Sequence, residues 1–494
     1  MTIPTDLRVP FVYVEFDPSR AFQGPSILRY KVLLIGQRLS GGLRPQLVVD
    51  KITSYSQAMQ LYGAGSQLSR MFKKFFDNNR ISDVYGCSLN DSGSGVKATG
   101  TFVIGGTASV DGSFIAYIGG ERVSVAVTSL MTSNQIATAL AAAIQADTEK
   151  PVSASAIGGT VTCTAKNAGE SGNEIDLRIN YNAGEELPTG ITCSVNGSGT
   201  QGIMSGGANN PTIQSVIDIL GDEWYNLICA PYWDATNMTA IEAELADRFG
   251  PLRMIDGIYI TSRMGTVGVL ESWGNGKNSP HVSVLHSQKA PCVSAEVAAM
   301  YVAQIAKEGQ ADPARPLQTL ELVGMLPPVV EHRFTLAENN ALLYDGISTF
   351  YVDSGGKIRI QRAITQYQRN GVGAEDIAYL DVETMLTLMF MRYDFRNQIL
   401  TKYSRAKLAD DGVQVGPGQQ IMTPKLGKSE AINIFRGWER LGLAENIDQF
   451  KNDLVCERSI TDPNRLNWIL PPDLINQFRV GAATIQFLLQ SPQV

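Results

Sequence analysis

The spacing of apolar residues changes along the chain and separates a region of alternating helices and strands from a region of strands alone. From residue 211 onward, apolar positions recur at helical spacing, and a short apolar run follows each such stretch. The predicted helices are 213–220, 238–245, 265–273 and 294–305, and the runs that follow them are 225–230, 254–260, 281–286 and 320–323. Repeated alternation of this kind predicts an α/β core, with a mostly parallel sheet flanked by helices.

Residues 91–209 follow a different pattern. Alternating or β-branched runs bounded by glycine predict strands at 101–104, 114–118, 123–127 and 161–164. One predicted helix interrupts them, with Ser133 as its cap and Ile136, Leu140, Ala143 and Ile144 on one face. Residues 91–210 also hold 19 of the 47 glycines and only four aromatic residues. We interpret this stretch as an inserted small β-rich domain that carries no chemistry of its own.

The last third of the chain is mixed. Apolar runs at 350–352 and 358–360 flank turn residues and predict a hairpin, and a long helix is predicted at 376–400. A second helix is predicted at 429–441, within a mixed α+β C-terminal domain. The predicted division is an N-terminal arm (1–30), the first part of the core (31–90), the inserted domain (91–209), the α/β core domain (210–375), the C-terminal domain (376–478) and a C-terminal arm (479–494).

Composition excludes several classes of protein. The 494 residues carry 41 basic and 48 acidic side chains, a net charge of −7, which argues against a general nucleic-acid coat. Six scattered cysteines without a C-x-x-C pair indicate a reducing compartment. Residues 11–14 are too short an apolar run for a signal peptide. The uncharged stretch 124–146 has the length of a membrane span, but its polar middle favours a turn and a helix cap. We therefore expect neither direct nucleic-acid binding nor membrane insertion.

The histidines form no metal-binding pattern. Only His281, His286 and His332 are present, and the first two lie five positions apart, on opposite faces of the predicted strand. The sequence therefore predicts no metal ligand.

Nucleophile and phosphate motifs are also incomplete. Asp91-Ser92-Gly93 and Asp353-Ser354-Gly355 resemble the aspartate element of subtilisins, but no matching histidine element or G-x-S-x-G elbow accompanies them. Asp, Ser and Gly are common turn residues, so turns are the better interpretation. The Gly276-Lys277 pair lacks the first glycine and the Ser/Thr of a phosphate-binding loop. We predict no catalytic residue and no cofactor.

Both ends of the chain carry apolar, strand-like runs. A strand that is apolar on both faces needs neighbours, which it finds in its own sheet or in another chain by strand addition. Runs of this kind at both ends favour exchange between subunits. The predicted inter-subunit strand contacts are Val9, Phe11, Val12, Tyr13, Val14, Phe16, Ala483, Thr484, Ile485, Gln486, Phe487, Leu488 and Leu489.

Several short motifs, in a specific order, carry a family resemblance. They are Lys31-Val32-Leu33-Leu34-Ile35-Gly36, Pro45, Ile52-Thr53-Ser54, Ala58, Tyr62-Gly63, Ser66, Leu68, Phe75-Phe76, Asn78, Asp345-Gly346-Ile347, Gly356-Lys357-Ile358-Arg359-Ile360, Arg362 and Ile364-Thr365. The chain resembles contractile tail sheath proteins of bacteriophages from about residue 4 to 489. The stretch 165–173 is similar to the insertion of Mu-like phages.

The resemblance implies a structural subunit and no enzyme. Sheath subunits of this family stack as hexameric rings around a tail tube, and their terminal arms link neighbouring subunits. The implied partners are copies of the same chain, the tail tube protein, and the baseplate and tail terminator proteins. The implied location is the virion, after assembly in the host cytoplasm, and contraction drives the tube through the host envelope. Two alternatives stay open on the residues alone: an α/β hydrolase or protease-like enzyme, and a non-contractile virion structural protein.

Charge is segregated along the chain in a way that suits an assembly. Residues 1–90 carry a net charge of +5, and residues 91–210 carry −5. We expect these two sets either to meet across subunits or to face solvent.

Overall fold

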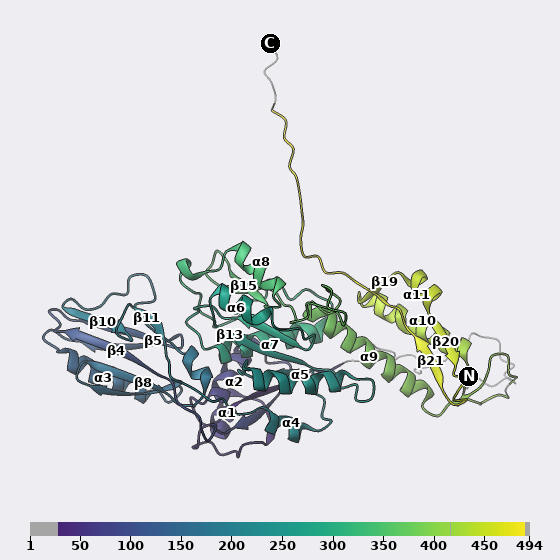
Figure 1. Cartoon of the computed structure of the whole chain (residues 1–494), viewed down its shortest axis with the longest axis horizontal. Helices are drawn as coiled ribbons and strands as arrows, with labels where there is room; N and C mark the ends of the chain where they lie inside the picture. The colour runs from purple at the N-terminus through teal and green to yellow at the C-terminus, as the bar shows by residue number, and fades with distance from the viewer. Residues whose placement is uncertain (1–27, 415, 490–494) are drawn as a thin grey trace, which may run out of the picture. The chain divides into compact units, whose positions relative to one another are not determined.

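The computed structural model describes residues 28–414 and 416–489, which belong to two compact units (Figure 1). One unit contains residues 29–386 together with 477–489, and the other contains Leu28 and residues 387–476. The predicted strand at 9–16, with Val9, Phe11 and Phe16, lies outside the described residues. No helix in the described ranges is long and apolar enough to cross a membrane.

A six-stranded sheet forms the centre of the larger unit. Its order is β14-β13-β12-β1-β3-β2, and every neighbouring pair is parallel except β2 and β3 at one edge. The strands are β1 (Lys31–Gln37), β2 (Val49–Ile52), β3 (Asp83–Leu89), β12 (Leu227–Cys229), β13 (Ile258–Arg263) and β14 (Val282–His286). Central strands of a parallel sheet are covered on both faces, so β1 is apolar and buried almost throughout. The mostly parallel sheet predicted from the alternating pattern is confirmed.

Helices cover both faces of this sheet. Outside the stretch between β3 and α4, the helices of the larger unit include α1 (Tyr55–Tyr62), α2 (Gln67–Asn78), α4 (Gln214–Leu220), α5 (Ala235–Phe249), α6 (Val267–Gly274), α7 (Ser294–Ala311) and α8 (Leu336–Tyr344), with the 3₁₀ segment η3 (Val330–His332). Leu33 and Ile35 of β1 share a core cluster with apolar residues of α4 and α5. On the other face α2 packs closely, because a Cβ at Gly86 of β3 would lie 2.8 Å from the Phe72 ring.

Between β3 and α4 the chain forms two antiparallel four-stranded sheets and one helix. The first sheet has the order β10-β4-β8-β7 and the second β11-β9-β5-β6. The elements are β4 (Thr99–Gly106), β5 (Gly112–Ile118), β6 (Glu121–Val127), α3 (Ser133–Ala146), β7 (Val152–Ile157), β8 (Thr160–Ala165), η2 (Glu170–Glu174), β9 (Asp176–Ile179), β10 (Ile191–Val195) and β11 (Gln201–Ile203). All four strands predicted here are present. The predicted cap is wrong by one residue: Thr132 is the N-cap of α3, and the Gln135 side chain accepts its N–H at 2.9 Å.

The hairpin of β15 (Thr349–Val352) and β16 (Ile358–Arg362) is present as predicted. The strand predicted at 320–323 is not formed, and this stretch makes an isolated bridge between Glu321 and Arg359. Thr319 and Gly324 on either side have φ angles of 67° and 87°, which interrupt the extended conformation that a strand needs.

The smaller unit contains helices and short strands. Its elements are α9 (Val382–Tyr403), whose first five residues belong to the larger unit, β17 (Lys407–Leu408), β18 (Ile421–Met422), α10 (Pro424–Arg440), β19 (Ala444–Glu445), α11 (Ile447–Asp453), β20 (Val455–Arg458), β21 (Leu466–Ile469) and β22 (Asp473–Leu474). Its core includes Phe435 stacked on Phe450 at 4.2 Å, beside Trp438. α9 begins at Val382 rather than at 376, because the backbone at Leu380 instead accepts the Thr365 N–H at 2.7 Å.

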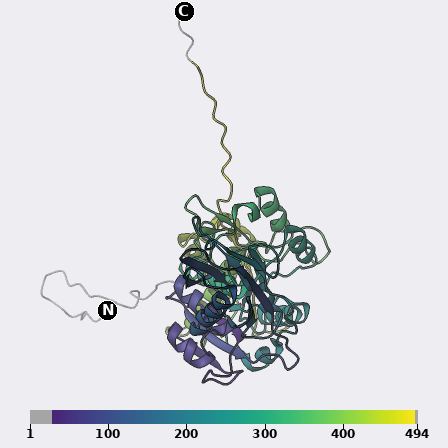
Figure 2. The same ribbon diagram turned by 90° about the vertical axis from the view of Figure 1, so that its left-hand side faces the viewer.

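The C-terminal segment, residues 480–489, forms no strand with any described part of the chain. In both views of the molecule (Figure 1 and Figure 2) it is an extended trace. The strand character of residues 483–489 is thus not realised among the residues that the structure describes.

Candidate functional site

Open α/β sheets usually bind ligands at the carboxyl edge of their parallel strands. In this sheet Asp91 follows β3 at that edge. One carboxylate oxygen of Asp91 accepts hydrogen bonds from the side chains of Gln37, at 2.8 Å, and Asn167, at 3.0 Å. The other oxygen accepts the Ala168 N–H at 3.0 Å. Asn167 and Ala168 lie between β8 and η2, so the chain's own loop occupies this part of the edge.

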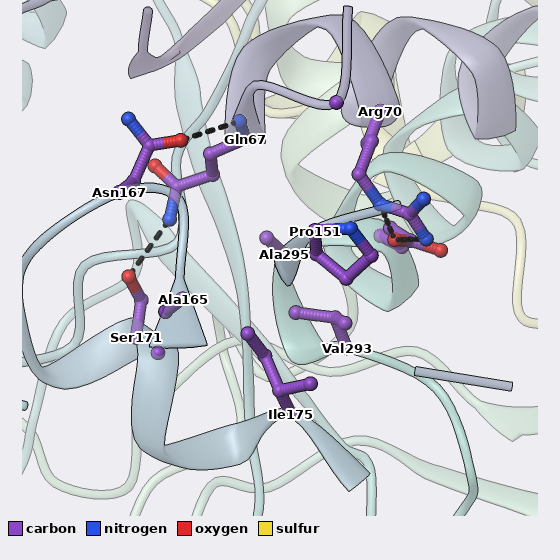
Figure 3. A pocket seen from close by; sticks show the side chains of 12 residues that line it. Gln67, Arg70, Pro151, Ala165, Asn167, Ser171, Ile175, Val293 and Ala295 are labelled. Carbon is purple, nitrogen blue, oxygen red and sulfur yellow. Dashed lines mark hydrogen bonds and ion pairs between the residues drawn. The ribbon is translucent and has the colours of Figure 1, made fainter. Parts of the chain in front are cut away.

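The start of α2 closes the same edge (Figure 3). The Gln67 N–H donates to Asn167 Oδ1 at 2.9 Å, and its side-chain amide donates to Ser171 Oγ at 2.8 Å. The space left beside Ile175 is a cavity of about 30 Å³. Such a volume holds only one or two water molecules. A substrate therefore does not fit at this position.

At the end of β13, Arg263 lies beside two tryptophan rings and close to a buried acid of η2, Glu174. The Arg263 guanidinium lies 4.3 Å from the ring centroid of Trp233 and 4.7 Å from that of Trp273. Glu174 accepts the Met264 N–H at 3.3 Å, and burial raises its pKa to about 7. A perturbed acid of this kind is a candidate general acid or base. Glu174 is only 7% exposed, so we interpret it as a structural acid.

A network of charged side chains joins α2 and α7 to the two antiparallel sheets. Arg70 of α2 donates from Nε to Glu296 of α7 at 2.6 Å, and its Nη1 lies 3.2 Å from Glu121 of β6. Lys150 and Lys73 also pair with Glu121, at 3.2 and 3.4 Å. The Arg70 and Glu296 side chains are almost fully buried. Figure 3 shows Arg70 and its ion pair at one side of the small cavity.

The electrostatics of this network favour its charged form. Burial alone would raise the pKa of Glu121, but Arg70, Lys150 and Lys73 outweigh it and lower the pKa to about 2. Burial alone would lower the pKa of Arg70, but Glu296 and Glu121 outweigh it and raise the pKa. Arg70 and Lys73 come from the basic segment of the sequence, and Glu121 comes from the acidic one. Some of the segregated charges thus meet inside one chain, whereas the expectation was that they meet across subunits or face solvent.

The two Asp-Ser-Gly motifs form turns, as predicted. In the first, the Gly95 N–H donates to the Ser92 carbonyl at 2.8 Å. In the hairpin turn, the Asp353 carboxylate accepts the N–H groups of Gly355 and Lys357, each at 2.9 Å. Both aspartate side chains therefore accept hydrogen bonds from backbone N–H groups.

The histidines take part in packing. His286 stacks on Phe350 with ring centroids 4.4 Å apart, and His281 lies 5.0 Å from Phe249. Burial lowers the pKa of His286 to about 3, so this ring is neutral at ordinary pH. No group of three or more possible metal ligands occurs among residues 28–414 and 416–489.

The predicted C-terminal contacts lie in the extended segment. Ala483, Thr484, Ile485, Gln486, Phe487, Leu488 and Leu489 are all exposed. Ile485, Phe487 and Leu489 are 88%, 77% and 84% exposed, although side chains of this kind are normally buried. The structure therefore presents an unpaired apolar segment. The predicted N-terminal contacts Val9, Phe11, Val12, Tyr13, Val14 and Phe16 are not among the described residues.

Comparison with known proteins decides the family. The phage tail sheath protein central domain matches residues 206–366, and the phage tail sheath C-terminal domain matches residues 374–488. The chain is 40% identical over 487 residues to the Mu-like prophage FluMu tail sheath protein of Haemophilus influenzae, and the match covers 99% of each chain. The chain belongs to the phage tail sheath family. The resemblance seen in the sequence is confirmed, and the family is a structural one.

Solved structures of sheath proteins are also similar to this chain. The sheath tail protein from Desulfitobacterium hafniense is 13% identical with a TM-score of 0.49, and the match covers 94% of this chain and 100% of that one. The contracted helical sheath of the anti-feeding prophage is 14% identical with a TM-score of 0.45, and the match covers 98% of this chain and 99% of that one.

Proposed function

We propose that this chain is the repeating subunit of a contractile tail sheath, stacked as hexameric rings around a tail tube. Contraction repacks the rings into a lattice of lower energy and drives the tube through the host envelope. The observation that carries the proposal is the exposed apolar segment 483–489, attached to a folded unit of a sheath-family chain. Its apolar side chains are stabilised only when another surface covers them.

The C-terminal segment adds as a strand to a sheet of a neighbouring copy in this proposal. The smaller unit offers suitable edges, because β20 and β21 form a two-stranded sheet, an arrangement that is marginally stable by itself. The outward cross-strand pair of this sheet, Val455 and Ile469, is 39% and 62% exposed. An added strand would extend this sheet and cover that pair. Residues 9–16 supply the corresponding N-terminal strand.

The remaining partners follow from the proposed assembly. They are the tail tube protein inside the rings, the baseplate at one end and a terminator protein at the other. Assembly takes place in the host cytoplasm and the product is part of the virion. In this proposal residues 91–209 form an inserted domain of each subunit.

The test separates the contribution of the apolar side chains of the segment from that of its polar side chains. Replacing Ile485, Phe487 and Leu489 together by serine should abolish the tubes seen by negative-stain microscopy, while circular dichroism stays at the wild-type value. The matched control replaces Thr484 and Gln486 by serine in the same segment and should leave tubes intact. Tubes of normal length from the triple variant would refute the proposed role of the segment.

The hydrolase alternative has a direct assay of its own. An activity-based serine probe that labelled one site stoichiometrically would favour an enzyme, and absence of labelling would favour the structural role.

A further inference from the structure

Arg479 lies in a partly buried cluster of charged side chains at the base of the C-terminal segment. Its Nη2 is 3.1 Å from Asp381 Oδ1 and 3.0 Å from Glu383 Oε1. Arg362 holds the same Asp381 with two hydrogen bonds, at 3.0 and 3.1 Å. Glu383 is fully buried and also accepts the Leu317 N–H at 2.7 Å. The guanidinium of the segment is therefore placed between two carboxylates that the larger unit already holds.

Gln318 contacts the same part of the segment, at Phe478 and Arg479. The Gln318 side chain donates to the Phe478 carbonyl at 3.2 Å and accepts from Arg479 Nη1 at 3.5 Å. Beyond Arg479, Val480 is 83% exposed, and no described residue pairs with the segment as a strand. Among the described residues, 478–479 are thus the last place at which hydrogen bonds and ion pairs hold the segment.

The cluster joins two points that are far apart in the sequence. Asp381 and Arg479 are separated by 98 positions, and all of residues 387–476 lie between them. The ion pairs therefore fasten together the chain that leaves the larger unit and the chain that returns to it. Without these pairs, the segment would be held by the Gln318–Phe478 hydrogen bond and the covalent chain, and that chain leads first to β22 and the smaller unit.

We propose that Arg479 is a positioning residue that fastens the C-terminal segment to the larger unit of its own chain. A pull exerted on the segment by a neighbouring copy then reaches the six-stranded-sheet unit through Asp381 and Glu383, and bypasses the smaller unit. This inference rests on the proposed role of the segment in linking subunits. Lysine does not replace arginine here, because a single ammonium lacks the planar fork that contacts Asp381, Glu383 and Gln318 together.

The first readout is independent of assembly. Hydrogen exchange of the unassembled full-length chain should be about tenfold faster or more in peptides covering 315–319 and 477–480 of Arg479→Ala, because one partner of a buried pair is lost. Arg479→Lys should recover only part of the protection. Arg315→Ala is the matched control, because Arg315 is an exposed arginine in the same loop and should leave exchange unchanged.

A second variant separates the fastening from the cost of burying the Glu383 charge without its arginine. Arg479→Ala/Glu383→Gln removes that negative charge. It should restore the urea midpoint of the larger unit towards the wild-type value, while exchange at 477–480 stays fast. Wild-type exchange in either variant would overturn the proposal.

The second readout is made on tubes. Tubes of Arg479→Ala should dissociate at a lower urea concentration than tubes of Arg315→Ala. Fast exchange in the unassembled chain with tubes of normal resistance would refute the transmission of force and leave the proposed sheath function standing. Failure of the wild-type chain to form any tube would instead refute the proposed function, and the exchange result would still stand.

Discussion

Two arginines of this chain sit between carboxylates, and the two regions differ in how well the charges are satisfied. Around Arg70, Glu121 faces three cations, and its pKa falls to about 2. Around Arg479, burial outweighs the attraction of the arginine, and the pKa of Glu383 is raised. The first cluster thus favours its charged form strongly, and in the second the carboxylate is only partly compensated.

The difference corresponds to what each cluster joins. Arg70 lies among α2, α7 and β6, which are also held by sheets and apolar packing, so it connects parts that are already fixed. Arg479 holds a segment that has few other contacts with its own chain. The same ion-pair chemistry therefore stabilises a folded unit in one place and holds a segment at a point in the other. Removal of Arg70 should therefore act mainly on global unfolding, and removal of Arg479 should act most strongly on local exchange at 477–480.

The largest expected effect comes from breaking the Arg70 cluster. Arg70→Met should lower the free energy of unfolding of the larger unit by about 3–5 kcal/mol, because Glu296 and Glu121 lose their buried partner. Urea denaturation of the unassembled chain measures this change. The control is Arg80→Ala, which removes an exposed arginine just after α2 and should change stability by about 0.5 kcal/mol or less. Equal effects of the two variants would mean that the buried Arg70 cluster contributes no more to stability than an exposed arginine.

The next largest effect is the pH dependence of stability that Glu121 gives to the Arg70 cluster. The pKa of Glu121 is about 2 in the folded chain against an ordinary value of 4.5. A lowered pKa contributes stability that is present above pH 4.5 and is lost as the pH falls towards 2. The contribution at neutral pH is at most about 3–4 kcal/mol, because each pKa unit corresponds to ~1.4 kcal/mol.

Glu121→Gln tests this assignment. The free energy difference between wild type and variant should be largest at neutral pH and should shrink between pH 4.5 and about 2. Urea midpoints measured across that range give the profile. A difference independent of pH would mean that Glu121 does not act through its charge.

The smallest effect is expected at the surface. Asp222 pairs with Arg253 at 3.0 Å, but its side chain is 84% exposed. Asp222→Asn should lower the free energy of unfolding by at most about 1 kcal/mol, because solvent screens exposed pairs. Thermal unfolding of the variant measures this change. A loss as large as that of Arg70→Met would show that burial does not decide how much an ion pair contributes to stability.

Local patterns predicted much of the fold. The alternation after residue 211 identified α4, α5, α6 and α7 and the strands between them, because apolar periodicity follows directly from helix and strand geometry. Glycine-bounded runs identified β4, β5, β6 and β8 for the same reason. The strand predicted at 320–323 failed because its ends adopt positive φ angles, which apolar spacing does not record.

The candidate sites were less predictable. Arg70 and Glu296 are 226 positions apart, and neither lies in a motif. The loop containing Asn167 and Ala168 was noticed only as part of a family resemblance. Its place at the carboxyl edge of the sheet depends on two sheets that form between β3 and α4.

The sequence by itself determined the α/β alternation, the apolar C-terminal run and the family, because these reside in local spacing and in the order of short motifs. Only the tertiary structure decided which charges meet, since Coulomb attraction and burial depend on distances that the folded chain sets. It also decided that residues 483–489 stay unpaired within the described chain. Strand propensity is a property of the residues, but a strand needs a partner to accept its hydrogen bonds.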